Sequence, residues 1–173
     1  ETSGQSVSFS AALLDGPSSY TVNVRATDPG GLSAVSSATV NVTNVAPTVS
    51  AAFASNSVSC GANNSTLTVN FSDPGVADTH SAVINWGDGN TQTVSPATSP
   101  LSLQHTYALA GAYTATISVS DDDGGTGNAI ASVMVKFNTS GFLQPINPNG
   151  TSVFKFNSTI PVKISFTNCN GST

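Results

Sequence analysis

The sequence is poor in charged residues, and basic side chains are the scarcest. Only four residues carry a positive charge, against nine acidic ones, in a chain of 173 residues. A nucleic-acid-binding surface needs clustered cations that displace counterions from phosphate. Arg25, Lys136, Lys155 and Lys163 are too scattered to form such a cluster. The composition therefore excludes nucleic-acid binding, and the net charge of −5 favours solubility over steering of a charged partner.

Long apolar runs are absent as well. No stretch approaches the roughly 18 consecutive apolar residues of a membrane-spanning helix, so we expect no membrane insertion. No secretion signal is visible, and the only methionine is Met134. We therefore expect the sequence to be a processed or internal piece of a longer protein.

Side chains suited to catalysis are also few. Glu1 is the only glutamate, and His80 and His105 are the only histidines. A nucleophile needs a nearby base and an orienting group, and glycosidase chemistry needs two carboxyl groups around one sugar. Because the aspartates lie in turn-like sequences, neither arrangement is visible, and we predict that the chain is not an enzyme.

Cysteine occurs twice, as Cys60 and Cys169. A four-ligand zinc site would have to recruit both histidines from distant loops, which disfavours zinc. In an extracellular protein a disulfide is the leading interpretation. The sequence leaves open whether the bond forms within one chain or between neighbouring copies.

Alternation is what the sequence does contain. Valine and alanine interleave with serine, threonine and asparagine, which is typical of sheets with one apolar and one hydroxyl-rich face. In residues 113–120, Tyr113, Ile117 and Val119 point to one side and hydroxyl residues to the other. Similar strands are predicted at residues 49–53, 66–71, 81–86 and 129–137. We therefore predict an all-β fold.

Several motifs punctuate these strands. The tetrapeptide Trp86-Gly87-Asp88-Gly89 is followed by His105-Thr106-Tyr107, then by Gly111 and Tyr113, and finally by Asp121 to Asp123 with two glycines. In this order the motifs resemble the polycystic-kidney-disease (PKD) domain over roughly residues 47–137. The resemblance implies an immunoglobulin-like β-sandwich of an extracellular binding or spacing module. It also implies that His105 packs as a structural residue and that Tyr107 and Tyr113 pin the sandwich by hydroxyl-to-backbone hydrogen bonds.

Residues 1–46 repeat part of this pattern at a constant offset of 93 positions. Tyr20 falls on Tyr113, Asp28 on Asp121, and Val42 on Val135. A shared register of this kind indicates tandem repeats. We predict that residues 1–46 are the C-terminal part of an incomplete PKD-like sandwich, joined to a complete one at residues 47–137.

Beyond Phe137 the composition changes. Short strands are predicted at residues 153–156 and 160–166, after a stretch rich in proline and asparagine. The segment Pro161-Val162-Lys163-Ile164 resembles the start of the PxKF domain of secreted bacterial proteins. Residues 138–173 are therefore predicted to be the N-terminal part of a PxKF-like β module.

Two incomplete modules in one chain suggest a mode of assembly. A partial sandwich exposes an apolar face and unpaired strand edges, so another segment or another copy must complete it. If copies donate strands to one another head to tail, filaments result. We predict an extracellular structural protein, a subunit of a self-assembling surface filament or matrix whose partners are other copies of itself.

The alternative is an adhesive or carbohydrate-binding spacer of a large secreted enzyme or adhesin. In that case exposed aromatic side chains would contact a polysaccharide. The candidates are Phe142, Phe154 and Phe156.

Two kinds of candidate site remain. Asp121, Asp122 and Asp123, with Asp88 or Asp28, could bind calcium as the only cofactor, or they could simply cap their own turn. Asn-X-Ser/Thr sequences mark possible glycosylation sites at Asn41, Asn63, Asn64, Asn70, Asn138, Asn149, Asn157 and Asn170.

Overall fold

The chain is built from β-strands. The computed structural model describes residues 8–10, 14–61 and 65–172, and these form twelve strands and no helix. None of the described residues lies in a helix with the length and hydropathy needed to cross a bilayer. The strands are β1 Ser18–Thr27, β2 Ser33–Val42, β3 Thr48–Phe53, β4 Ser57–Ser59, β5 Ser65–Ser72, β6 His80–Asn85, β7 Thr91–Val94, β8 Leu101–His105, β9 Gly111–Asp121, β10 Thr126–Lys136, β11 Asn138–Leu143 and β12 Lys163–Thr167.

Strands β3 to β10 form an immunoglobulin-like sandwich of two sheets. One sheet has the order β4-β10-β9-β6-β7 and the other β3-β5-β8. Because side chains alternate along each strand, both sheets present an apolar face to the space between them. The largest fully buried side chains fill that space: Trp86, Tyr107, Leu67, Ile84, Ile117, Val69, Val119 and Val135.

The strands predicted at residues 49–53, 66–71, 81–86, 113–120 and 129–137 are confirmed as β3, β5, β6, β9 and β10. Three shorter strands, β4, β7 and β8, have no counterpart in the sequence-based prediction. Each is three to five residues long and holds its place through its neighbours, as β4 does beside β10. Short strands of this kind carry too few alternating residues for a pattern to be recognised.

Strands β1 and β2 form a hairpin of their own, outside the sandwich. Their pairing runs from Ser18 opposite Val42 to Thr27 opposite Ser33. In the sandwich, β9 and β10 pair from Gly111 opposite Val135 to Ser120 opposite Thr126. Adding 93 to every residue number of the first ladder therefore gives the second.

The turns of the two hairpins are built in the same way. The backbone N–H of Asp28 donates to the carbonyl of Leu32 (2.9 Å), as that of Asp121 donates to Gly125 (3.1 Å). The N–H groups of Leu32 and Gly125 donate back to Oδ1 of the respective aspartate (2.9 and 2.6 Å). The glycine inside each turn has a positive φ, 89° in one and 90° in the other. The equivalence thus extends from pairing to turn geometry.

The two hairpins differ in what covers them. Ile117 of β9 is 1 % exposed, because its sheet packs on β3-β5-β8. Val24, at the equivalent position of β1, is 46 % exposed. Among the described residues no second sheet lies over the apolar face of the β1–β2 hairpin.

At the other end, β11 and β12 form a third, irregular hairpin. They pair from Asn138 opposite Thr167 to Leu143 opposite Lys163, with a bulge between. The predicted strand at residues 153–156 is wrong, since this segment lies in the loop between the two strands. Lys155 to Ser158 make a turn (N–H to carbonyl 3.1 Å), and Asn157 has a φ of 61°. This turn bends the backbone away from an extended course, so no ladder forms.

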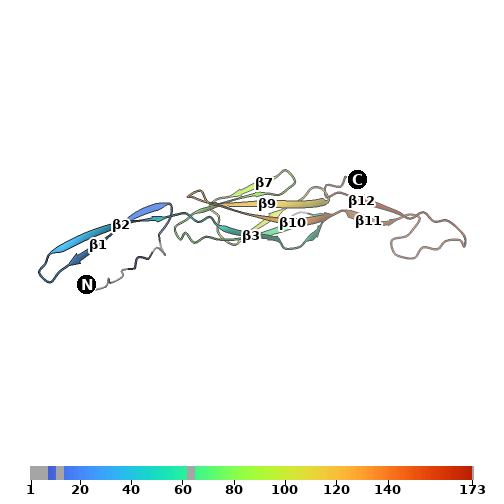
Figure 1. Cartoon of the computed structure of the whole chain (residues 1–173). Coiled ribbons are helices and arrows are strands. Elements are labelled where there is room, and N and C mark those ends of the chain that lie inside the picture. Colours follow the sequence, from blue (N-terminus) through green and yellow to red (C-terminus); the bar gives the residue numbers. More distant parts are fainter. Residues whose placement is uncertain (1–7, 11–13, 62–64, 173) are drawn as a thin grey trace.

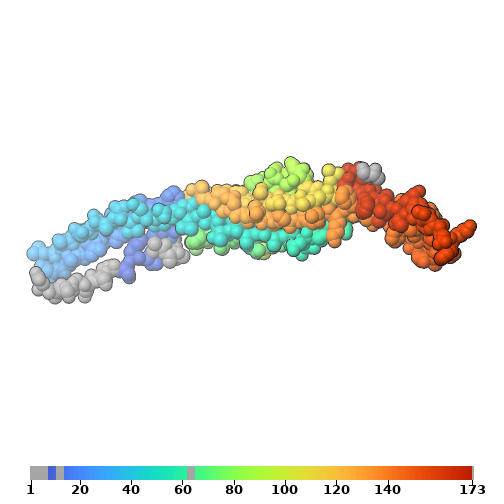
Figure 2. Space-filling model, turned by 45° about the vertical axis from the view of Figure 1, so that its right-hand side comes forward, coloured from blue at the N-terminus to red at the C-terminus, as the bar shows by residue number. Residues whose placement is uncertain are grey.

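The units follow one another along an elongated molecule. Figure 1 shows the β1–β2 hairpin, the sandwich and the β11–β12 hairpin in a row. The space-filling view shows the same order, with the two hairpins at opposite ends (Figure 2). The central sandwich therefore has two junctions. The first joins it to the β1–β2 hairpin, and the second joins it to the β11–β12 hairpin.

The equivalence of Val24 and Ile117 gives a stability test. Ile117→Ala should lower the free energy of unfolding by about 2–5 kcal/mol, because it empties space in a packed core. In the monomeric chain, Val24→Ala should change it by less than about 0.5 kcal/mol, since removing a side chain that is 46 % exposed leaves no cavity. Urea denaturation followed by the fluorescence of Trp86, which reports on the sandwich, measures both. Equal losses would contradict the assignment of the two faces.

Candidate functional site at the junctions of the sandwich

The signature residues form one stack of rings. Trp86 lies flat on His105 (centroids 4.5 Å, planes 5° apart), and Tyr107 meets His105 edge-on at 4.6 Å. Tyr113 stacks on Tyr107 at 4.0 Å. The Tyr107 hydroxyl donates to the Trp86 carbonyl (3.0 Å), and the Tyr113 hydroxyl donates to the Leu109 carbonyl (2.9 Å). The stack therefore joins the C-terminal ends of β6 and β8 to β9.

Asp88 anchors the turn beside this stack. Its Oδ2 lies 2.8 Å from Nε2 of His105 and accepts from the Asn90 side chain (3.0 Å), while its Oδ1 accepts from the Asn90 backbone N–H (3.0 Å). Gly87 has a φ of 82°, and a Cβ there would lie 2.5 Å from the Thr114 carbonyl oxygen. Gly87 therefore allows the turn to pack closely against Thr114, and the Asp88 carboxylate holds the turn by hydrogen bonds.

These contacts shift the pKa values of the acidic groups. Burial acts to raise the pKa of Asp88, but the hydrogen bonds from His105 and Asn90 outweigh it and lower the pKa below its usual value. Burial, with the nearby Asp88 charge, raises the pKa of Tyr107 to about 12 and also raises that of Tyr113. Both hydroxyls therefore remain protonated donors at neutral pH.

The predicted calcium ligands do not all come together. β6 pairs with β9 so that His80 lies opposite Asp121 and Asn85 opposite Thr116. Asp88 follows Asn85 and therefore lies at the end of the sandwich away from Asp121, Asp122 and Asp123. The predicted calcium ligands therefore lie in two separate turns. Asp88 belongs to the turn between β6 and β7, and the other three belong to the turn between β9 and β10.

Two of the three turn aspartates hold the backbone. Asp121 Oδ1 accepts the N–H groups of Asp123 (3.1 Å) and Gly125 (2.6 Å), and its Oδ2 accepts the Asn44 side chain (3.0 Å). Asp122 Oδ1 accepts the N–H of Thr79 (2.8 Å). Against the opposing effect of burial on Asp121, these donors lower the pKa of both carboxyl groups. The Asn44 contact also binds the β2–β3 linker to the sandwich.

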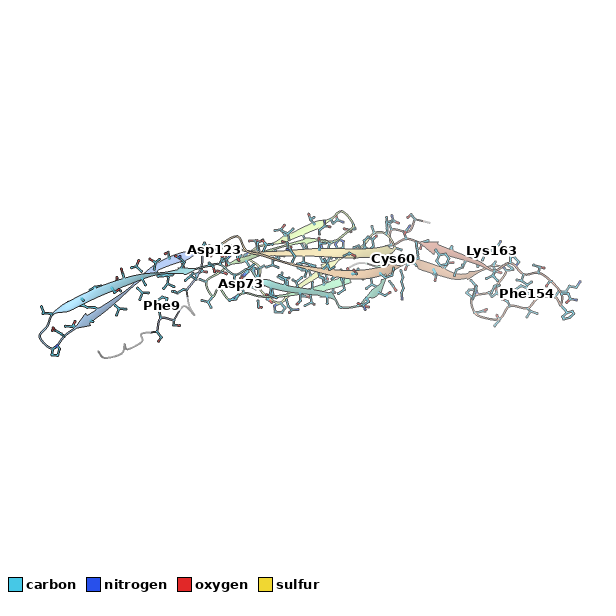
Figure 3. All side chains as sticks on the ribbon, viewed as in Figure 1. Phe9, Cys60, Asp73, Asp123, Phe154 and Lys163 are labelled. Carbon is cyan, nitrogen blue, oxygen red and sulfur yellow. A yellow bond between two sulfur atoms is a disulfide. The ribbon has the colours of Figure 1, made fainter. Side chains whose placement is uncertain are left out.

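The structure adds acidic residues that sequence reasoning missed. One oxygen each from Asp15, Asp78 and Asp123 lie within 4.8 Å of one another, and Asp73, Asp78 and His80 form a second such group. Figure 3 shows Asp73 and Asp123 at the end of the sandwich that faces the first hairpin. Asp15 precedes β1, whereas Asp78 precedes β6 and Asp123 lies in the β9–β10 turn. This group is called the junction triad below and consists of Asp15, Asp78 and Asp123.

Asp78 is the most confined member of the triad. Its two carboxylate oxygens are buried, and no N–H or O–H group of the described residues donates to them. The carboxylate folds over Gly75, where a Cβ would collide with it. Burial, the facing Asp15 carboxyl and the charges of Asp73 and Asp121 raise the pKa of Asp78 to about 6. Next to the triad, a cleft of about 210 Å³ is lined by residues that include Leu14, Asp15, Asn44, Pro74 and Gly75.

The second junction is covalent. Cys60 and Cys169 form a disulfide within the chain, which answers the question that the sequence left open. Nearby, the N–H of Asn170 donates to the carbonyl of Ala108 (3.1 Å), and the N–H of Ala110 donates to the side chain of Asn168 (3.2 Å). The segment after β12 is therefore fastened to the loop between β8 and β9.

The remaining candidate residues lie at the surface. The sequon asparagines within the described residues are all exposed: Asn41, Asn70, Asn138, Asn149, Asn157 and Asn170. Asn63 and Asn64 lie outside the described residues. Phe142, Phe154 and Phe156 are 50 %, 41 % and 88 % exposed, all in the C-terminal unit.

The hydrogen bonds that the Asp88 carboxylate accepts predict an acid-sensitive contribution to the free energy of unfolding. Because its pKa is lower in the folded than in the unfolded state, the contribution is present above the unfolded pKa of about 3.9 and disappears as the pH falls through the folded value. Asp88→Asn should lower the free energy of unfolding at pH 7 by about 1–3 kcal/mol. It should also flatten the decline below about pH 4. Urea titrations at several pH values check both; an unchanged acid slope in the variant would contradict the role of this carboxylate.

The disulfide makes a separate prediction. Replacing both cysteines, Cys60→Ser with Cys169→Ser, should lower the free energy of unfolding by about 2–4 kcal/mol, because the bond closes a long loop. The oxidised chain should also migrate faster than the reduced chain on a denaturing gel. A dimer band that disappears on reduction would instead indicate pairing between copies.

The sequence matches the family described as "PKD domain" over residues 44–136. A search of curated proteins gave no match. A solved structure described as "Structures of Clostridium thermocellum CbhA fibronectin(III)-like modules" is similar, with 17 % identity and a TM-score of 0.38; the match covers 68 % of this chain and 63 % of that one. The family match extends over more than half of the chain and contains the whole sandwich, so the chain belongs to the PKD-domain family.

Proposed function

We propose that this chain is an extracellular, non-catalytic structural module, one link in a linear assembly whose neighbours complete its open hairpins. One observation carries the proposal: the β1–β2 hairpin has the register and turn of the β9–β10 hairpin but no covering sheet among the described residues. The PKD family and the intrachain disulfide support an extracellular setting.

The equivalence supports a repeat. The ladders of the two hairpins are offset by 93 positions, and the family match from residue 44 to residue 136 spans the same number of residues. In this proposal residues 14–42 correspond to the last two strands of a second PKD-type unit. What that unit requires is a layer equivalent to β3-β5-β8, since this layer buries Ile117 and Val133 in the complete sandwich.

An uncovered hairpin needs that layer for stability. A two-stranded hairpin is marginal in water, and each large apolar side chain that it buries contributes about 1.5–3 kcal/mol. Val24 is 46 % exposed, and Tyr20, Val22 and Val40 of the same face are only half-buried. Covering this face would therefore supply a favourable free energy of association.

We propose that the layer comes from a second copy of the chain. The β11–β12 hairpin also exposes apolar side chains, with Phe142, Ile164 and Phe166 at 50 %, 45 % and 52 %. The two open hairpins lie at opposite ends of the molecule (Figure 2). A contact between one end of a copy and the other end of the next is head-to-tail, so it propagates into a filament. The resemblance of residues 138–173 to a PxKF domain belongs to the same proposal, as the C-terminal joining unit.

A second function is favoured by the aromatic residues of the C-terminal loop. Phe156 is 88 % exposed and Val153 is 93 % exposed, so neither side chain is packed in a core. A spacer that holds a polysaccharide on exposed rings would use such side chains. In that case the covering strands come from the same polypeptide, and copies do not assemble.

Assembly distinguishes the two functions. The full chain should form particles whose mass rises with concentration in light scattering, and fibres in negative-stain microscopy. Val24→Lys should prevent this by placing a charge on the open face. Val83→Lys is the matched control, because Val83 is 44 % exposed but lies on the outer side of the complete sandwich.

Two outcomes decide against the filament. Monomers at every concentration would contradict it, and so would equal effects of the Val24 and Val83 substitutions. Retention of such monomers on an insoluble polysaccharide, lost in Phe156→Ala, would support the spacer.

A further inference from the structure

The segment that connects β2 to β3 is docked on its neighbours rather than surrounded by solvent. It consists of residues 43–47 and is called the linker below. Pro47 is buried and Asn44 is half-buried. The Asn44 side chain also donates to Oδ2 of the buried Asp121 (3.0 Å). The linker is therefore held both near its beginning and at its end.

On one side the linker packs against the segment before β1. Gly16 of that segment is buried. A Cβ on Gly16 would lie 2.6 Å from the carbonyl carbon of Thr43 and 2.7 Å from the backbone nitrogen of Asn44. Both distances are shorter than van der Waals contact, so a side chain at this position would push the linker away.

On the other side two glycines of the sandwich adjoin the linker. Gly125 lies in the β9–β10 turn, where a Cβ would be 2.8 Å from Cα of Ala46. Gly127 lies in β10, where a Cβ would collide with the carbonyl oxygen of Pro47. Gly16, Gly125 and Gly127 are called the glycine clamp below, because all three lie against the backbone of the linker.

The glycine clamp supplies space rather than backbone freedom. None of its three residues has a positive φ, so the backbone at each position would accept a side chain. In the β1–β2 hairpin, the positions 93 residues before Gly125 and Gly127 carry Leu32 and Ala34, with the same pairing and turn. Both of those side chains are exposed. The hairpin geometry therefore tolerates side chains here, and it is the linker that requires glycine at positions 125 and 127.

We propose that the glycine clamp holds the linker in one course and makes the first junction a rigid joint, with a fixed orientation between the β1–β2 hairpin and the sandwich. This inference goes beyond the proposed function, because a linear assembly can form from units joined by flexible or by rigid linkers.

The linker sequence also favours a single course. Pro47 fixes its own φ and disfavours the helical region for Ala46, which precedes it. The hydrogen bond from Asn44 to Asp121 adds a directional contact. Units joined by small polar contacts usually move relative to one another. Close approach at the three glycines adds dispersion contacts along the linker, and these oppose such motion.

A rigid first junction complements the disulfide at the second junction. With both joints held, the sandwich sets the distance and the direction between the two hairpins (Figure 1). A spacing module of defined reach needs such joints, because a flexible linker makes the distance between the ends variable.

Distances between two spin labels test the joint. Labels on Ser37→Cys in β2 and Thr93→Cys in β7, both at exposed positions, report the placement of the hairpin relative to the sandwich. The native Cys60 and Cys169 are paired with each other and do not take up label. Pulsed electron paramagnetic resonance of the full chain should give one narrow distance distribution. Dilution with unlabelled chain keeps the measurement intramolecular if copies assemble.

Substitutions in the glycine clamp should loosen the joint. Gly16→Ala and Gly127→Ala should each widen the distance distribution at least about twofold or displace its maximum, because the added Cβ displaces the linker. Gly61→Ala is the matched control, since a Cβ there meets no atom within 4 Å and Gly61 has no positive φ. The control should keep the width and the maximum of the parent distribution.

Urea denaturation followed by Trp86 fluorescence separates orientation from stability. Gly16 lies outside the sandwich, so Gly16→Ala should leave the unfolding midpoint of the sandwich unchanged. This variant keeps the test valid if Gly127→Ala does not fold. A broad distribution in the chain that carries only the two labels would overturn the proposal. So would a distribution in Gly16→Ala with the width and maximum of the Gly61→Ala control.

Discussion

Covering the apolar face of a β-hairpin is the constraint on which the rest of this structure depends. A two-stranded ladder satisfies its internal hydrogen bonds but leaves its apolar face exposed to water unless a second sheet packs on it. In the sandwich, the sheet β3-β5-β8 provides that layer for β9 and β10, and Ile117 and Val119 are almost fully buried. The ring stack of Trp86, His105 and Tyr107 then fixes how the strands meet.

The same constraint explains why the chain is organised as a row. The β1–β2 hairpin repeats the ladder of β9 and β10, yet lacks the second layer among the described residues. At each junction polar or covalent contacts join the sandwich to the neighbouring segment. Asn44 bonds to Asp121 at one end, and the Cys60–Cys169 disulfide lies at the other.

Much of this architecture could be predicted from the sequence, because its main features are local or periodic. Alternation predicted the five longer sandwich strands, and the offset of 93 positions between Tyr20 and Tyr113 equals the offset between the ladders of the two hairpins. The site at the first junction could not be predicted in the same way. Asp15 and Asp78 are far apart in sequence and belong to different units, and no local pattern places them together. Grouping Asp88 with Asp121 failed because β6 and β9 run antiparallel, which puts the two turns at opposite ends.

The position of the disulfide also determines how the molecule carries tension. When the two ends of the chain are pulled apart, force passes along the backbone to Cys60 and crosses the sulfur bridge directly to Cys169. The intervening residues, within a sequence separation of 109, include β5 to β12 and lie outside that path. They cannot be drawn out into extended chain while the bridge is intact. Oxidation therefore limits the extensibility of the protein, and reduction would release most of its contour length.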